Sequence, residues 1–166
     1  MTNWLKYIGI LVLLLFLQVL LLDNLHWLGL VHPFVYLWAL LMLPIELPRW
    51  LQMVIGAAIG MVMDLFTHAP GIHMAGCVMV AYLRPLLVAR YVQDIDRLKG
   101  AITINSIGVG NYFRLLALLV VVQHTVVFLL EAFTFAHFGF TLLQIILSSL
   151  FSYAFILMFE YLRKNT

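Results

Sequence analysis

Three side chains with acid–base and metal-binding chemistry lie close together in the sequence: Asp64, His68 and His73. A tight turn with Pro70 and Gly71 lies between the two histidines, so the chain can reverse there and bring the three together. A carboxylate and two imidazoles suit a zinc site or a proton relay, but no HExxH sequence or pair of CxxC sequences accompanies them. We therefore expect no metal and no cofactor, and interpret the imidazoles as helix caps, as partners of the carboxylate or as side chains at the membrane interface.

Two kinds of intramembrane protease chemistry can be compared with these residues. An aspartyl peptidase needs two carboxylates that share one water, one protonated and one ionised. Asp64 could pair with Asp23 or Glu131, but no motif supports such a dyad. A rhomboid-type serine site needs GxSG, which the chain lacks, and Cys77 has no base beside it in the sequence. The sequence predicts a protein without enzymatic activity, and the aspartyl peptidase stays as an alternative.

The composition indicates that these residues are carried by a membrane protein. Of 166 residues, 65% are hydrophobic and 10% are charged, and the mean hydropathy is +1.09. A soluble globule of this size could not hide so much apolar surface. We expect an all-α integral membrane protein with one transmembrane domain over residues 1–166. The net charge of +2 is too small and too scattered for a nucleic-acid-binding stripe.

Hydrophobic runs long enough to cross about 30 Å of hydrocarbon predict six transmembrane helices. Their expected ranges are residues 4–22, 31–47, 50–66, 73–91, 112–134 and 140–162. The first run lacks a small-x-small cleavage site at its end, so we interpret it as a retained helix. The second is the weakest, because Pro33, Pro44 and Pro48 interrupt a short run, and a re-entrant segment is the alternative.

The basic residues favour six helices over five. With six, one side carries Lys6, Arg49, Arg90, Arg97, Lys99, Arg114, Arg163 and Lys164, and the loops of the other side carry no Lys or Arg. Removing the second helix would move Arg49 to the opposite side and break this asymmetry. Because positive loops stay in the cytoplasm, both termini are expected there. The cytoplasmic loop 92–111 would contain the charged residues Asp94, Asp96, Arg97 and Lys99, with a short surface helix over 93–99 as its only expected structure.

Small and polar residues inside the spans predict how the helices pack. Gly56 and Gly60 form a GxxxG pair, and Asp64 continues the same spacing, so another backbone can approach this stripe closely. A carboxylate there should find a partner. At the same outer side, we expect a polar cluster that includes His68 and Glu131.

Other polar residues within the spans are interpreted as contacts between helices. Arg84 must reach inward or pair with a carboxylate such as Glu46. Helical spacing places the remaining polar side chains on shared faces, with His124 and Glu131 on one helix and Thr141, Gln144, Ser148 and Ser152 on another.

The segment Gly56-x3-Gly60-x3-Asp64-Leu65-Phe66, followed by Pro70-Gly71-x-His73 and a membrane helix, resembles the signature of the MreD family of bacterial rod-shape-determining proteins. The chain length and the six hydrophobic runs agree with that family. The matched residues carry over as a family signature and not as a catalytic set. The chain departs from the pattern in having His68 inside the turn and a proline-rich second span.

The resemblance implies a scaffold in the bacterial inner membrane that binds the bitopic protein MreC. It also implies that the chain acts together with MreB, RodA and the transpeptidase partner of RodA in lateral peptidoglycan synthesis. The implied fold is similar to that of the substrate-binding subunits of energy-coupling-factor vitamin transporters. That fold leaves a small-molecule-binding subunit of a transporter as an alternative function.

Overall fold

The computed structural model of the chain describes residues 9, 12–22, 31–92, 100–132 and 138–164. The regular elements in these ranges are all helices. In chain order they are η1 (Gln18–Leu22), α2 (Leu37–Leu41), α3 (Arg49–Thr67), α4 (Ile72–Tyr91), α5 (Ile104–Ile107), α6 (Val109–Ala132) and α7 (Phe138–Lys164).

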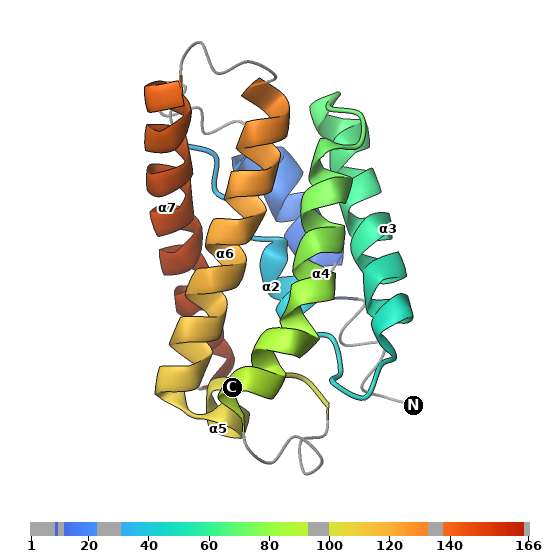
Figure 1. Cartoon of the computed structure of the whole chain (residues 1–166), viewed down its shortest axis with the longest axis vertical. Coiled ribbons are helices and arrows are strands. Elements are labelled where there is room, and N and C mark those ends of the chain that lie inside the picture. The colour runs from blue at the N-terminus through green and yellow to red at the C-terminus, as the bar shows by residue number, and fades with distance from the viewer. Residues whose placement is uncertain (1–8, 10–11, 23–30, 93–99, 133–137, 165–166) are drawn as a thin grey trace.

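Helices α3, α4, α6 and α7 form the frame of the molecule. All four are long and apolar enough to cross a membrane. They stand side by side with their long axes aligned, α3 against α4, α4 against α6, and α6 against α7 (Figure 1). Their bounds agree with the predicted spans 50–66, 73–91, 112–134 and 140–162 to within one helical turn at each end. The expectation of an all-helical fold with membrane-spanning helices is confirmed for these four helices.

The two ends of the bundle differ in charge. One end, called here the arginine end, holds Arg49, Arg90, Arg114 and Arg163. The opposite end, called the turn end, holds the α3–α4 turn at residues 67–73 and the last turn of α6. Among the described residues, the turn end has no Lys or Arg.

The first predicted helix is described over part of its length. Residues 12–17 are α-helical and lead directly into the π-helical turn η1. Leu14 and Gln18 on this stretch are buried against the bundle.

The prediction of a spanning helix over residues 31–47 is wrong. Only the five residues of α2 are α-helical, and extended or turn conformations flank them. Every residue from 34 through 42 is nevertheless buried, and α2 lies inside the bundle (Figure 1). The proline residues restrict this stretch to conformations outside the helical ladder, as Pro33 and Pro44 lack the N–H that a helix interior needs. The result is a largely non-helical segment, 31–47, which we call the crossing segment.

The crossing segment runs parallel to α7 from the turn end to the arginine end. The backbone N–H of His32 donates to Ser148 and that of Phe34 to Ser152, with N–O distances of 3.0 and 2.7 Å. Further along, the Trp38 indole donates to Glu160 at 3.1 Å. At the arginine end, Pro44 pairs with Ala101 in an isolated bridge.

A non-helical backbone inside a membrane protein is tolerated only where other groups satisfy its polar atoms. Besides the two serines, Gln18 accepts from the Val35 N–H and donates to the Pro33 carbonyl, at 2.9 and 2.8 Å. Arg84 donates to the carbonyl oxygens of Leu41 and Leu43. Polar side chains from three helical elements therefore replace the hydrogen bonds that a helix would have made for itself.

Of the two alternatives for Arg84, reaching inward or pairing with a carboxylate such as Glu46, the structure shows the first. Its third contact is Gln52 on α3, whose Oε1 accepts at 2.8 Å. Glu46 instead accepts from the Gly100 N–H at 2.8 Å and links Gly100 to the end of the crossing segment. The buried guanidinium faces carbonyl and amide oxygens, whose dipoles stabilise its charge, and its Nε has no hydrogen-bond partner among the described residues.

The loop after α4 leads to a short helix and not to a domain. Thr103 and Ser106 form a capping box at α5, and the left-handed Gly108 separates α5 from α6. Glu160 on α7 accepts from the Ile104 N–H at 3.2 Å and binds Arg163, which fixes α5 to α7. The surface helix expected over 93–99, with the charged residues Asp94, Asp96, Arg97 and Lys99, lies outside the described residues.

Candidate functional site at the turn end

The glycine stripe of α3 lies directly against α4. A Cβ atom on Gly60 would stand 2.3 Å from the Met74 Cα, and one on Gly56 would stand 2.9 Å from the Cys77 carbonyl oxygen. Both distances are too short for a real side chain. The absence of side chains at these positions is therefore what lets the two backbones touch, in agreement with the GxxxG spacing.

Asp64, one turn beyond Gly60, binds the backbone at the start of α4. Its Oδ1 accepts from the His73 N–H at 2.8 Å, and its Oδ2 accepts from the N–H groups of Gly71 and Met74 at 3.0 and 3.1 Å. The first N–H groups of a helix have no partner inside the helix, and the helix dipole favours a negative charge there. A carboxylate from α3 thus caps α4.

The turn between Asp64 and α4 depends on two left-handed residues. His68 ends α3 with φ 55° and ψ 30°, and Gly71 precedes α4 with φ 84°. Gly71 adopts this conformation without the steric cost of a side chain. The His68 side chain is exposed. Its backbone N–H donates to the Asp64 carbonyl and forms the αL cap of α3, so the cap at this position is made by the backbone and not by the imidazole.

His73 is buried and faces the crossing segment. Its Nδ1 lies 3.0 Å from the Tyr36 hydroxyl, which accepts from Gln123 Nε2 at 2.9 Å. Asp64 therefore meets His73 through the backbone, whereas the imidazole belongs to a network with α6 and the crossing segment. The Phe34 ring packs edge-on against His73, with 5.1 Å between ring centroids.

A second buried histidine supports the same segment. His124 Nδ1 donates to the Val120 carbonyl at 2.8 Å, and because a carbonyl can only accept, the other ring nitrogen is the acceptor. Ser152 donates to that Nε2 at 3.0 Å while accepting from the Phe34 N–H. The His124 ring stacks on Phe34 with centroids 4.6 Å apart. This role fits the expected contact between helices.

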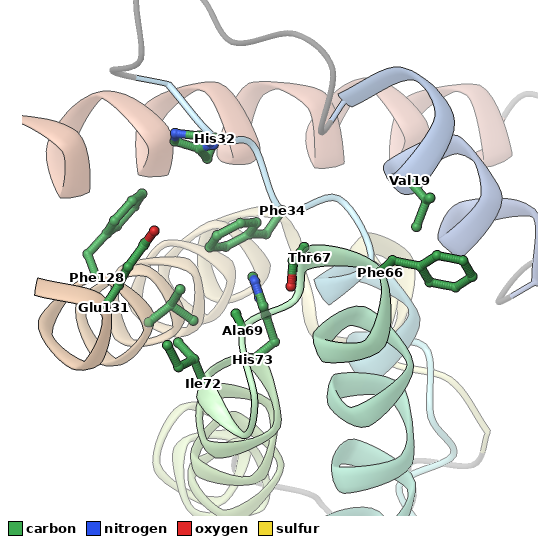
Figure 2. Close-up of a pocket in the computed structure, with 11 residues that line it drawn as sticks. Val19, His32, Phe34, Phe66, Thr67, Ala69, Ile72, His73, Phe128 and Glu131 are labelled. Atoms are coloured by element: carbon green, nitrogen blue, oxygen red, sulfur yellow. The ribbon is translucent and has the colours of Figure 1, made fainter.

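Above these contacts lies a pocket of about 370 Å³ at the turn end (Figure 2). It lies between the α3–α4 turn, the last turns of α6, the start of the crossing segment and Val19 of η1. Its polar side chains are His32, Thr67, His73 and Glu131, and its aromatic rings are Phe34, Phe66 and Phe128. Figure 2 shows His73 pointing from α4 toward Phe34 and the Glu131 carboxyl pointing from α6 toward the crossing segment.

The pocket brings together only some of the residues singled out by the sequence. His73 and Glu131 both line it, whereas His68 and Asp64 are not among its lining residues. Gly56 and Gly60 serve the α3–α4 contact below it. No group of three His, Cys, Asp or Glu residues that could hold a metal ion occurs within the ranges that the structure describes.

Sequence reasoning missed the contribution of the crossing segment to this pocket. His32 and Phe34 belong to the stretch predicted as the second transmembrane helix, where no special position would distinguish them. Pro33 between them was the available signal, because a proline makes a regular helix improbable and leaves neighbouring side chains free to face the interior.

The chain was compared with protein-family models, with curated proteins and with solved structures, and none of the three comparisons found a match.

Proposed function

We propose that this chain is a non-enzymatic scaffold of the rod-shape machinery in the bacterial inner membrane, and that it acts by binding MreC. The observation that carries the proposal is the use made of Asp64, the charged residue of the MreD-like signature. Both of its oxygens are bonded to backbone N–H groups of α4. A carboxylate held in this way builds a helix pair and is poorly placed to act as a catalytic acid or base.

The remaining signature residues support the same interpretation. Gly56 and Gly60 let α3 and α4 touch, and Gly71 permits the turn. The signature thus specifies a rigid helical hairpin. A rigid hairpin is what a membrane scaffold needs, because association in lipid depends on close packing and on polar contacts and not on the hydrophobic effect.

The charge distribution supports a fixed orientation for such a scaffold. The arginine end would face the cytoplasm, where MreB acts, and the turn end would face outward. In the proposed arrangement, residues 4–22 and the crossing segment join the four long helices to make six passes, with both termini in the cytoplasm. RodA and its transpeptidase partner would belong to the same assembly.

The test is capture of MreC by this chain from detergent extracts, together with complementation of cell shape. Asp64→Ala removes the cap of α4, whereas Asp64→Asn keeps one oxygen that can accept. We expect Ala to reduce capture more than Asn at equal expression. Glu46→Gln, at the arginine end, is the matched control. Normal capture and normal rods with Asp64→Ala would remove Asp64 from the mechanism.

An assay for peptidase activity tests the enzymatic alternative. Purified protein should leave a lipoprotein precursor intact. Cleavage that is lost in Asp64→Asn would replace the scaffold by an aspartyl peptidase.

The pocket favours a second candidate function, a small-molecule-binding subunit of a membrane transporter. Its volume of about 370 Å³ lies in the usual range for ligand sites, and a few polar groups converge among aromatic rings. Ligand binding and scaffolding are separable by experiment, because the pocket residue Glu131 is distinct from the α3–α4 signature.

A further inference from the structure

Among the acidic residues that the structure describes, Glu131 differs from the rest. Glu46 accepts from Gly100, Asp64 from three N–H groups of α4, and Glu160 from Trp38 and Ile104 with Arg163 beside it. Glu131 makes no hydrogen bond or ion pair within the described part of the chain. Its side chain is exposed on the last turn of α6, so its carboxylate is accessible to a molecule that enters from the turn end.

The surroundings of Glu131 restrict what that partner can be. The carboxyl group lines the pocket, and the other polar lining side chains are His32, Thr67 and His73. His32 packs edge-on against Phe128, with centroids 6.0 Å apart, and Phe34 stacks on Phe128 at 6.1 Å. The two buried phenylalanine rings form an apolar wall with Ile72 and Val127, and the exposed Phe66 ring at the same pocket can attract a cation.

Among the described residues, no Lys or Arg side chain lies at the turn end to pair with the Glu131 carboxylate. The described Lys and Arg residues lie at the arginine end, at the other end of the four long helices, or are enclosed as Arg84 is. Within the described part of the chain, the negative charge of Glu131 is therefore left available to a bound cation.

We propose that the pocket at the turn end binds a small organic cation with an apolar body, its positive group against Glu131 and its body against Phe34 and Phe128. The carboxylate repels anions. A neutral molecule would bind more weakly than a cation, because it forms neither an ion pair with the carboxylate nor a cation–π contact with an aromatic ring. This inference goes beyond the scaffold proposal and rests on the second candidate function, whose ligand class it names.

The experiment uses the purified full chain in lipid nanodiscs and isothermal titration calorimetry, with empty discs subtracted. Benzyltrimethylammonium is the probe. Neopentylbenzene, its neutral carbon isostere, and phenylmethanesulfonate, an anion of similar shape, are the comparison molecules. We expect saturable binding of the cation, at least tenfold weaker binding of the neutral isostere and none of the anion, where tenfold corresponds to about 1.4 kcal/mol.

Two variants locate the binding. Glu131→Gln keeps the shape of an exposed side chain and removes its charge, so we expect about tenfold weaker binding of the cation. Ala69→Leu places a larger side chain at the pocket wall and should abolish binding. Glu46→Gln removes a carboxylate at the arginine end and should bind the probe like the unaltered chain.

Three results would overturn the proposal: no saturable binding of benzyltrimethylammonium, equal affinity for its neutral isostere, or unchanged affinity in Glu131→Gln. Cell-shape complementation by the same variants separates this proposal from the scaffold. A chain that restores rods but binds no cation would refute the pocket assignment alone. A chain that binds the cation but neither captures MreC nor restores rods would refute the scaffold alone.

Discussion

Asp64 and His73 meet through the backbone: Oδ1 of Asp64 lies 2.8 Å from the amide nitrogen of His73, while the His73 imidazole bonds to Tyr36. The two signature residues therefore contact different parts of the structure with their side chains. Asp64 joins α3 to α4, and His73 joins α4 to the crossing segment. Separate substitutions should separate these two contacts.

Asp64→Ala should lower the free energy of unfolding by about 2 kcal/mol or more, because three N–H groups at the start of α4 lose a charged acceptor. Asp64→Asn should cost less, since its amide oxygen can still accept. Unfolding in mixed micelles, followed by circular dichroism, measures both. Equal stability of the Ala and Asn variants would contradict the capping role.

Gly60→Ala should impair folding, since its Cβ would overlap the Met74 backbone. Gly139→Ala on α7 is the matched control, because a Cβ there meets nothing within 4 Å. Replacing an exposed helical glycine by alanine stabilises by roughly 0.5–1 kcal/mol. The readout is the yield of monodisperse protein in detergent. A normal yield of Gly60→Ala would mean that α3 and α4 can separate at little cost.

Ser152→Ala should lower stability by about 1–2 kcal/mol, because it leaves the Phe34 N–H and His124 Nε2 without their partner. Ser149 lies on the same helix and is also buried, but its hydroxyl has no partner among the described residues. Ser149→Ala should therefore be neutral or slightly stabilising. Thermal unfolding of the two variants in one detergent gives the comparison, and similar losses would contradict a specific role for Ser152.

The four long helices could be predicted from the sequence, because the mean hydropathy over about 20 residues indicates whether a segment can lie in the membrane. It does not report the backbone conformation. The crossing segment is as apolar as a spanning helix, so composition alone placed a helix there. Its prolines indicated the exception, but the groups that satisfy its backbone come from Gln18, Arg84, Ser148 and Ser152, which no local pattern connects to it.

The candidate site was predictable only in part for the same reason. The GxxxG-x3-D spacing predicts close packing of α3 and a bonded Asp64, since both depend on neighbours within one hairpin. The pocket depends on how four separate segments meet. The sequence therefore grouped His73 with Asp64 and His68, and Glu131 with His68, but it did not indicate that His73 and Glu131 line one pocket with Phe34.

Arg84→Lys should impair folding, although it keeps the positive charge. The guanidinium bonds to Gln52, Leu41 and Leu43 through two separate nitrogens. The single nitrogen of a lysine side chain cannot reach all three acceptors with the same geometry. Arg90→Lys, at an exposed position on the same helix, is the control and should behave like the unaltered chain. Yield and thermal stability in detergent report the difference. Equal stability of both variants would show that charge alone suffices at Arg84.

The topology can be tested with single cysteines in whole cells. The native Cys77 is fully buried, so it should not react with a membrane-impermeant maleimide. A cysteine in place of the exposed His68 should react, and one in place of Arg97 should react only after the membrane is permeabilised. Labelling of position 97 in intact cells would reverse the proposed orientation.

The crossing segment also bears on how the chain is made. Its backbone partners Ser148 and Ser152 lie 116 and 118 residues further along than the N–H groups that they accept from. During synthesis, residues 31–36 leave the ribosome well before α7 exists, and lipid offers no hydrogen bonds for them in the meantime. Insertion and folding must therefore be separate events for this segment. A nascent chain stalled before α7 should be digested by protease within residues 31–47, and one stalled after α7 has emerged should be protected there.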